Sequence, residues 1–477
     1  MKKAEDIKKK LVYTKKSFWQ DTTKNEQKIA FRFAEGYKKF LSTCKTEREV
    51  IEYTVKELRD KSFVNLDEKE GTRSRFVYKV FKNKAIAIAI LGKQPLNKGI
   101  NIIGSHIDSP RIDLKQNPLH EDGTTKLGIM KTHYYGGIKK YQWMSTPLSM
   151  HGIVVKNDGT KVKINIGEDD SEPVFIMPDL LPHLARKEQM TKTMPEAITA
   201  GQMNVVFNTI PYNEDRDKED VKEAVKLQAL LLLNEKYGIT EEDMFSAEIQ
   251  LVPAGHARDA GLDKSMIAAY GQDDRICAYT SLQAIFDVKE LDIAKSTVLF
   301  FFDKEEVGSD SVGGATSIFI EEFIGDLLRI KHEDISSANL RKTLVNTNVI
   351  SADVTAAVNP NFPSVHEIQN AALMGHGVGV CKYCGAGGKS STNDATSEFM
   401  SKLLRIFNDD KVNWQVCQLG KVDEGGGGTI AKYIAQHGCD TIDIGPALMG
   451  MHSLYELSSK ADIYSSYKAY KAFLVNA

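Results

Sequence analysis

The sequence has few cysteines, no excess of either charge and no long hydrophobic run. Its six cysteines are scattered over 477 residues without the spacing of a disulfide framework, so we expect reduced thiols and a cytoplasmic protein. Lys and Arg number 62 against 64 Asp and Glu, a net charge of −2, which gives no sign of a nucleic-acid or membrane-surface partner. No stretch approaches the roughly 20 apolar residues of a membrane span. Residues 1–21 contain seven lysines but no apolar run of secretory-signal length.

The rest of the composition is that of a folded globular chain. Hydrophobic residues make up 42% of the sequence and charged residues 26%. At 477 residues the chain exceeds one ordinary core, so we expect two domains or one large domain with an insertion. The sequence contains no internal repeat and no low-complexity tract.

The character of the sequence changes near residue 113 and again near residue 251. Between these points, short alternating strands are separated by turn residues, which is typical of an antiparallel subdomain. On either side, helices and apolar strands alternate, which predicts an α/β fold with a doubly wound, mixed sheet and helices on both faces. We therefore expect one α/β domain formed by residues 1–112 and 252–477, with an inserted, mostly-β domain at residues 113–251.

Hydrophobic periodicity and capping signals predict the individual elements. A capping box at Thr46 and Glu49 marks one helix start. The expected helices are 25–41, 46–61, 219–237, 275–286, 313–328, 393–406, 429–436 and 458–474. The expected strands are 75–81, 85–91, 100–105, 150–156, 161–166, 297–302, 344–350, 378–383, 412–417 and 439–444.

Acidic residues follow the apolar strand at residues 297–302, which continues into Asp303-Lys304-Glu305-Glu306. Taken alone, such a charge run is more often a solvated loop. A carboxylate at the end of a buried strand, however, needs a partner or a metal ion. Other metal-competent side chains stand in similar places, most of them just after an expected strand: His106 and Asp108, Asp273, Asp353, and His452. Because ligands in open α/β sheets collect beyond the carboxyl ends of the strands, the sequence predicts a site at that edge.

The donor set favours a pair of divalent metal ions such as zinc. It contains two imidazoles and three or four carboxylates but no thiolate. In His106-x-Asp108 the aspartate can hold the second N–H of the imidazole. In Glu305-Glu306 one carboxylate can bind metal while its neighbour acts as a general base. Either Asp273 or Asp274 can bridge the two ions, although Asp274 also suits the cap of the following helix.

These motifs together resemble those of a known family. The five segments are His106-x-Asp108, Asp273-Asp274-Arg275, Asp303-Lys304-Glu305-Glu306-Val307-Gly308-Ser309, Ser351-Ala352-Asp353 and Met451-His452-Ser453. They resemble, in order and over nearly the whole chain, the metal-site motifs of the aspartyl/vacuolar aminopeptidases, which are dinuclear zinc exopeptidases. The resemblance implies the zinc exopeptidase fold, in which the inserted domain makes dimer contacts.

The resemblance also implies a role for each residue. One zinc ion is expected on His106, Asp273 and Asp353. The other is expected on Asp273, Glu306 and His452, with Asp273 as the bridge. Glu305 is expected to be the general base and Asp108 to orient His106. Cobalt or manganese can replace zinc in such a site.

Members of the resembled family form tetrahedral dodecamers that enclose their active sites. Pro182-His183-Leu184 resembles the segment whose histidine reaches the active site of a neighbouring subunit. Lys382 stands where acidic-selective members contact the substrate's side-chain carboxylate. Residues 383–392 depart from the aspartyl-specific pattern, so the sequence leaves the preferred N-terminal residue open.

The sequence therefore predicts a cytoplasmic, homo-oligomeric metallo-aminopeptidase that acts on peptides with a free N-terminus. A dinuclear carboxypeptidase or an N-acyl amino acid deacylase of the same clan is the nearest alternative. A non-catalytic shell or cargo-binding protein is a more distant one. Retention of Glu305 with a full ligand set argues against that third possibility, because a silent protein has no need of so many clustered carboxylates.

Overall fold

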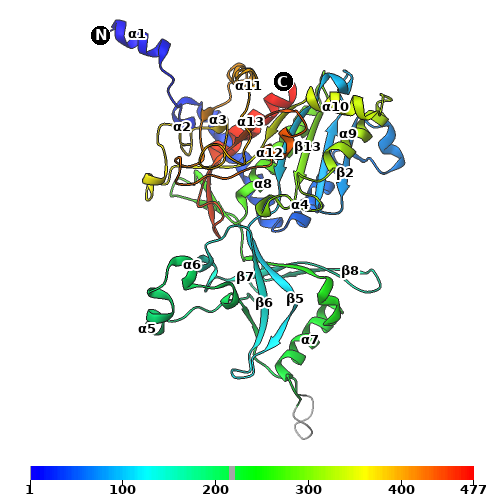
Figure 1. The fold of residues 1–477 in the computed structure, drawn as a ribbon, viewed down its shortest axis with the longest axis vertical. Coiled ribbons are helices and arrows are strands. Elements are labelled where there is room, and N and C mark those ends of the chain that lie inside the picture. The colour runs from blue at the N-terminus through cyan, green and yellow to red at the C-terminus, as the bar shows by residue number, and fades with distance from the viewer. Residues whose placement is uncertain (1, 214–220) are drawn as a thin grey trace.

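The computed structural model describes residues 2–213 and 221–477, which form two lobes (Figure 1). The main lobe contains a nine-stranded sheet, a five-stranded sheet and most of the helices. The inserted lobe, built on a six-stranded sheet, extends from it. The chain enters the inserted lobe in β5 (Arg111–Glu121) and returns in β10 (Glu248–Pro253), and these two strands pair in antiparallel fashion.

The nine-stranded sheet is mixed, as the sequence predicts. Strands β13, β4, β14 and β18 are parallel neighbours. Strand β3 pairs in antiparallel fashion with both β2 and β13, and β16 pairs antiparallel to β18. In spatial order the strands are β1 (Val64–Asn65), β2 (Phe76–Phe81), β3 (Ala85–Ile90), β13 (Thr297–Phe302), β4 (Asn101–His106), β14 (Asn348–Ser351), β18 (Asp440–Gly445), β16 (Val378–Cys381) and β17 (Trp414–Val416).

Helices cover both faces of this sheet because its central strands are apolar on both sides. In β13, Leu299 and Phe301 join one buried cluster, whereas Phe300 and Phe302 join the cluster on the opposite face. This arrangement confirms the predicted doubly wound α/β architecture. The helices of the main lobe are α1 (Lys2–Leu11), α2 (Phe18–Asp21), α3 (Lys24–Thr43), α4 (Glu47–Asp60), α8 (Gln272–Val288), α9 (Phe319–Ile330), α10 (Ser337–Val345), α11 (Ser397–Asp409), α12 (Ala431–Ala435) and α13 (Lys460–Asn476).

The inserted lobe has its own core, formed between its sheet and helix α7. Its surface carries exposed apolar side chains between residues 180 and 194, including Leu184 and Met190, which are each 65% exposed. Besides β5 and β10, its elements are β6 (Gly128–Tyr135), β7 (Leu148–Val155), β8 (Lys161–Ile166), β9 (Val205–Asn208), α5 (Pro182–Ala185), α6 (Met194–Ala197) and α7 (Ala224–Tyr237).

A small five-stranded sheet supports the start of α8 and the turn that carries His452. Its strands, in spatial order, are β11 (Arg258–Ala260), β12 (Met266–Ala269), β20 (Glu456–Ser459), β19 (Ala447–Met449) and β15 (Thr355–Ala356). His452 therefore lies between β19 and β20 rather than directly after β18, because β19 intervenes.

Several predicted boundaries were wrong. The strand expected at 344–350 is the end of α10 followed by β14, so Leu344 is helical. The helix expected at 313–328 begins at Phe319, because residues 311–318 form turns. The helix expected from Ser458 begins at Lys460, after β20. The helix expected at 219–237 begins at Ala224, and its first two predicted residues lie outside the described part of the chain.

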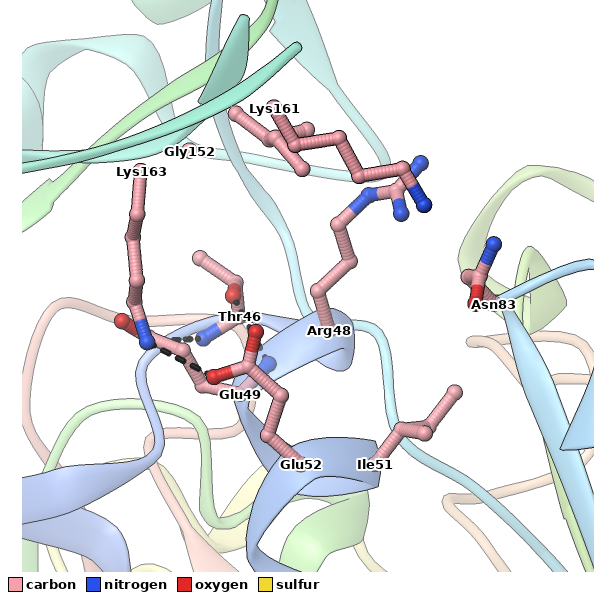
Figure 2. A pocket seen from close by; sticks show the side chains of 10 residues that line it. Thr46, Arg48, Glu49, Ile51, Glu52, Asn83, Gly152, Lys161 and Lys163 are labelled. Atoms are coloured by element: carbon pink, nitrogen blue, oxygen red, sulfur yellow. Dashed lines mark hydrogen bonds and ion pairs between the residues drawn. The ribbon is translucent and has the colours of Figure 1, made fainter. Parts of the chain in front are cut away.

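The lobes meet around α4 and the β7–β8 hairpin. His151 in β7 contacts two carboxylates, with Nδ1 3.0 Å from Glu49 Oε1 of α4 and Nε2 3.0 Å from Glu168 Oε1 of the inserted lobe. Next to this contact is a pocket of about 150 Å³, lined by α4 and by Lys161 and Lys163 of β8 (Figure 2). The pocket contains none of the predicted site residues.

All six cysteines are free thiols and buried. Within the described residues, every helix is too short or too polar to cross a lipid bilayer.

Candidate metal centre

The carboxyl ends of β4, β13 and β14 bring four predicted site residues to one edge of the main sheet. His106 is the last residue of β4. Glu305 and Glu306 lie in the short helix η7 (Glu305–Val307) after β13, and Asp353 lies two residues after β14. Because β4 pairs in parallel with both β13 and β14, these side chains meet at the same edge, as the sequence predicts.

Asp273, at the start of α8, stands between two imidazoles. Its Oδ1 lies 3.1 Å from His106 Nε2, and its Oδ2 lies 3.3 Å from His452 Nε2. Glu306 Oε2 is also 3.3 Å from His452 Nε2. A single carboxylate with one oxygen toward each imidazole has the arrangement of a bridging ligand.

The spacing of these atoms fits metal coordination. Two ligands of one tetrahedral zinc ion lie roughly 3.3 Å apart, given bonds of about 2.0–2.1 Å. The three contacts of Asp273 and Glu306 with the imidazoles fall within 0.2 Å of that spacing. Asp353 Oδ1 and Glu305 Oε2 are farther from His106 Nε2, at 3.9 and 4.0 Å.

Both imidazoles present the nitrogen that a metal requires. His106 Nδ1 lies 3.1 Å from the backbone oxygen of Asp108 and 3.3 Å from its Oδ1, and His452 Nδ1 lies 2.8 Å from the backbone oxygen of Gly137. Since oxygen acceptors face both Nδ1 atoms, each Nδ1 carries the proton and donates it. With a metal ion bound on the side of Asp273, each Nε2 would offer its lone pair to that ion, and Nδ1 partners of this kind are typical of metal-binding histidines.

Asp108 connects three parts of the site. Its Oδ1 accepts the backbone N–H of Glu305 at 3.2 Å, and its Oδ2 accepts that of Glu306 at 3.3 Å. Its Oδ2 also accepts the hydroxyl of Tyr135 at 2.6 Å. Together with its contacts to His106, these bonds orient the Asp108 side chain. They also hold the backbone of Glu305 and Glu306 at a fixed position relative to the imidazole of His106.

The cluster contains more negative charge than its imidazoles can balance. Burial, with the negative charges of Asp108 and Asp273, raises the pKa of Glu305 to about 7. Burial also raises the pKa of Glu306 and of Asp353 well above the usual range. One oxygen of Glu306, Oε1, is buried without a hydrogen-bond partner. A buried, unpaired carboxylate is costly unless a cation is present, so the residues fit bound divalent ions.

The imidazoles titrate in the opposite sense. Burial on its own lowers the pKa of His106, but its bonds to Asp108 and Asp273 raise that pKa well above its usual value. Burial likewise lowers the pKa of His452, yet Asp273 and Glu306 raise it to about 10. Acidic oxygens therefore surround both rings and stabilise positive charge at their Nε2 atoms.

Asp274, the alternative bridge, lies on the His106 side only. Its Oδ2 accepts the backbone N–H of His106 at 3.4 Å, rather than capping α8 as expected. Oxygens of Asp274 and Asp353 and a ring nitrogen of His106 lie within 4.8 Å of one another, so Asp274 is close enough to contact an ion there. Of these two aspartates, Asp273 is the one that faces both imidazoles. The geometry therefore favours Asp273 as the shared carboxylate.

The two imidazoles differ in exposure. The His106 side chain is 2% exposed, whereas the His452 side chain is 34% exposed. His452 lies in a tight turn with φ of +64°. Glu305, at 16% exposed, remains accessible to solvent beside the buried imidazole.

Two predicted residues do not join this cluster in the monomer. His183 is exposed on α5 of the inserted lobe, far from the main sheet (Figure 1). Lys382 follows β16, and its Nζ lies 3.6 Å from Asp394 Oδ1. Lys382 also lines a surface hollow along α11.

Three residues at the site were not predicted. Tyr135 and Gly137 contact Asp108 and His452, and both belong to the inserted lobe. Glu456 of β20 accepts the backbone N–H of His452 at 3.0 Å and that of Asp273 at 3.2 Å. The only sequence signal for the first two is an aromatic residue followed by Gly136-Gly137 at the end of a strand, a pattern that permits close backbone approach.

The family model and the similar curated proteins indicate the same family. Residues 40–474 match the family model described as aminopeptidase I zinc metalloprotease (M18). A protein of Borreliella afzelii named probable M18 family aminopeptidase 1 is 47% identical over 461 residues, which is 96% of this chain and 99% of the relative.

Solved structures are similar over almost the whole chain. The crystal structure of an M18 aminopeptidase from Thermotoga maritima has a TM-score of 0.91 and 45% identity, and covers 98% of this chain and 100% of that one. The S. cerevisiae mApe1 dodecamer has a TM-score of 0.74 at 20% identity, with 94% and 97% covered. The last comparison supports the fold alone.

Proposed function

The chain belongs to the aminopeptidase I zinc metalloprotease (M18) family, and on that premise we propose that its site holds a pair of zinc ions and uses Glu305 as general base. As a member of this family, the chain is a metallo-aminopeptidase, which releases the N-terminal residue of a peptide. The observation that carries the proposal is the position of Asp273, with one oxygen toward each imidazole.

The ligand assignment follows the two sides of Asp273. His106, Asp273 and Asp353 would hold one ion, and Asp273, Glu306 and His452 the other. The second group is supported by oxygen and nitrogen atoms that all lie within 4.8 Å of one another. The first is supported by the 3.1 and 3.9 Å distances from His106 Nε2 to Asp273 and Asp353. Cobalt or manganese would fit the same donors.

Bound zinc supplies Lewis acidity, which polarises the peptide carbonyl and makes water a better nucleophile. Glu305 then takes a proton from the attacking water at a carboxylate oxygen and returns it to the leaving amine. Asp108 keeps His106 in one tautomer and, through the backbone N–H of Glu305, holds the base beside it. The partial exposure of Glu305 supports this role, because the base must meet both water and peptide.

A homo-oligomer is the second part of the proposal. The solved yeast relative mApe1 is a dodecamer, and we extend that assembly to this chain. The inserted domain, residues 113–251, would make subunit contacts, and its exposed apolar side chains near α5 and α6 support that use. His183, exposed on α5, would reach the active site of a neighbouring subunit and assist the tetrahedral oxyanion.

Substrate preference and compartment are the third part. Peptides with a free N-terminus are the proposed substrates, and Lys382 is the proposed contact for an acidic side chain. Lys382 Nζ lies 3.6 Å from Asp394 Oδ1, so an acidic substrate side chain would have to compete with Asp394 for this contact. Six free, buried thiols support a reducing compartment, for which we propose the cytoplasm.

The central test is metal removal and reconstitution. The purified protein is stripped with a chelator, its zinc content is measured, and amino-acid p-nitroanilides are assayed before and after zinc, cobalt or manganese is added. A panel of N-terminal residues, with N-acetyl amino acids as the contrasting substrate, is assayed on the reloaded protein, and the particle mass is measured alongside.

We expect the stripped protein to be inactive and zinc to restore activity toward free-amine substrates. Equal activity in the stripped and reloaded protein would remove the metal from the mechanism. Hydrolysis of N-acetyl amino acids with free-amine substrates left intact would replace the aminopeptidase assignment by a deacylase.

A further inference from the structure

The end of strand β6 lies against the metal centre, although β6 belongs to the inserted lobe. Tyr135, its last residue, donates its hydroxyl to Asp108 Oδ2 at 2.6 Å. Two residues later, the carbonyl of Gly137 accepts the Nδ1–H of His452 at 2.8 Å. One short segment of the inserted lobe thus supports both imidazoles, directly for His452 and through Asp108 for His106.

Two glycines allow this close approach. A Cβ added at Gly136 would lie 3.4 Å from the Cβ of Glu306, and one added at Gly137 would lie 3.4 Å from His452 Nδ1. Gly136 also adopts a φ of +74°, which favours glycine. The backbone therefore passes the site so closely that even a Cβ at either glycine would be in van der Waals contact with Glu306 or His452.

The ring of Tyr135 packs against two cations, Arg111 of the neighbouring strand β5 and Lys304 of the main lobe. It is 8% exposed, and the guanidinium of Arg111 lies 3.8 Å from the ring centroid. The ammonium of Lys304 is 4.9 Å from the same centroid. Because a carboxylate only accepts hydrogen bonds, the hydroxyl must donate to Asp108, so both its position and its direction are fixed.

We propose that residues 135–137 of the inserted lobe position both metal-binding imidazoles, so that metal affinity depends on how this lobe docks. The inference rests on the proposed function, since it assumes that His106 and His452 bind metal. Tyr135 is then a positioning residue, which acts on His106 through Asp108. Gly137 supplies the partner that fixes the tautomer of His452.

The expected effect of removing the Tyr135 hydroxyl is a loss of metal affinity. Partners of metal-binding histidines typically change metal affinity by about 10- to 100-fold when they are removed. Loss of the Tyr135 hydroxyl leaves Asp108 with one donor fewer and leaves His106 less firmly oriented. Coupling is reciprocal, so bound metal must in turn stabilise the contact between the β6 end and the main lobe.

The test compares Tyr135→Phe with Tyr134→Phe. Each variant loses one hydroxyl from adjacent residues of β6, but Tyr134 is 40% exposed and points away from Asp108, so it is the matched control. Zinc affinity is measured by competition with a chromophoric chelator, and the cobalt-loaded proteins are compared by visible absorption. Both readouts are independent of turnover.

We expect Tyr135→Phe to bind one of its zinc ions about 10- to 100-fold more weakly and to show an altered cobalt spectrum. Tyr134→Phe should match the parent protein in both. Parental zinc affinity and an unchanged cobalt spectrum in a folded Tyr135→Phe variant would overturn the inference.

A second measurement uses only the parent protein, so it tests the coupling between bound metal and residues 135–137 even if Tyr135→Phe does not fold. Amide hydrogen exchange of the parent protein is compared with and without zinc. We expect the segment at residues 134–138 to exchange faster once zinc is removed, while strands β7 and β8 of the same lobe stay unchanged. Equal exchange at 134–138 in both states would overturn the coupling. Failure of the parent protein to bind zinc at all would instead overturn the proposed function.

Discussion

The two lobes contribute to the metal centre in different ways. The main lobe buries apolar strands on both faces and supplies every imidazole and carboxylate of the cluster. The inserted lobe contributes a phenol hydroxyl and a backbone carbonyl, from Tyr135 and Gly137. It also presents exposed apolar side chains at its own surface.

The main lobe therefore provides the groups proposed to bind metal, whereas the inserted lobe provides contacts that support them. The donors that need exact spacing project from the ends of parallel strands, which packing on two faces makes rigid. The supporting contacts come from a lobe that docks from outside, across polar contacts such as that of His151 with Glu49 of α4. We therefore expect main-lobe substitutions at the site to remove activity without unfolding, and junction substitutions to act mainly on stability.

The largest effect is expected in the main lobe. Glu305→Gln keeps the size of the side chain but removes the proposed base, so we expect kcat to fall by a factor of about 10² to 10⁴. Zinc content and melting temperature should stay near those of the parent protein, because Glu305 is not a proposed ligand. Kinetics on amino-acid p-nitroanilides and atomic absorption check both. Glu290→Gln, at an 81% exposed position after α8, is the control. Near-normal turnover of Glu305→Gln would place the base elsewhere.

The next effect tests whether the inserted lobe also takes part in chemistry between subunits. His183→Ala removes the proposed oxyanion donor, so we expect kcat to fall by about 10²- to 10³-fold. His120→Ala, exposed on β5 of the same lobe, is the control.

Complementation separates action within and between subunits. Mixed assemblies of His183→Ala and Glu305→Gln chains should regain activity, because some sites then pair an intact base with a neighbour's intact histidine. Mixed assemblies no more active than the sum of their components would contradict a role across subunits.

The third effect is on the stability of the junction and depends on pH. Burial alone lowers the pKa of His151, but its bonds to Glu168 and Glu49 raise the net pKa above the usual value. Lys45, with its Nζ 3.8 Å from Glu168, and Lys163, whose charge lowers the pKa of Glu49, are further charged groups near the contact. A raised pKa in the folded state means that this stabilisation is complete below about pH 6.5, the unfolded value, and is lost as pH rises through the folded pKa.

We expect His151→Asn to lose roughly 1–3 kcal/mol of stability at pH 6, the cost of leaving buried polar groups unpaired, and less at higher pH. The melting temperature of the parent protein should therefore fall more steeply between pH 6 and 9 than that of the variant. Thermal unfolding across this range checks the slope. Parallel pH profiles for the two proteins would show that His151 does not titrate with folding.

The smallest effect is expected beside the same junction, at the rim of the pocket in Figure 2. Lys163 and Glu52 form a 2.7 Å ion pair between the lobes, but their side chains are 52% and 61% exposed. Because exposed pairs contribute little, Lys163→Met should change stability by less than about 1 kcal/mol. A loss in thermal unfolding as large as that of His151→Asn would show that surface pairs, and not the buried contact, hold the lobes together.

Local signals predicted the elements that carry the site. The run of apolar residues at 297–302 is β13, and the Thr46 and Glu49 capping box is formed as expected. Failures occurred where a short apolar run fits a helix or a strand equally well. Leu344 precedes β14 closely enough to fit one continuous strand, yet it lies in the last turn of α10, a helix that the Ser336 cap begins.

For the site, the sequence predicts which side chains could bind metal, but it does not predict how each of them is directed. Motifs identified His106, Asp273 and His452, and the structure brings them together, although their roles stay predictions. Motifs did not separate Asp273 from Asp274, since the direction of each side chain depends on the backbone at the start of α8. Gly137 acts through a carbonyl that every residue has, so no residue type could mark it.

The unequal exposure of the two histidines sets an order for exchange of ions with bulk solvent. If two ions bind as proposed, the ion beside the half-buried His452 should exchange faster than the ion beside His106, whose side chain is only 2% exposed. During long dialysis we therefore expect zinc content to pause at one ion per chain before it reaches zero. On the proposed two-ion site, a preparation with one ion per chain would be a half-depleted enzyme and not a mononuclear one.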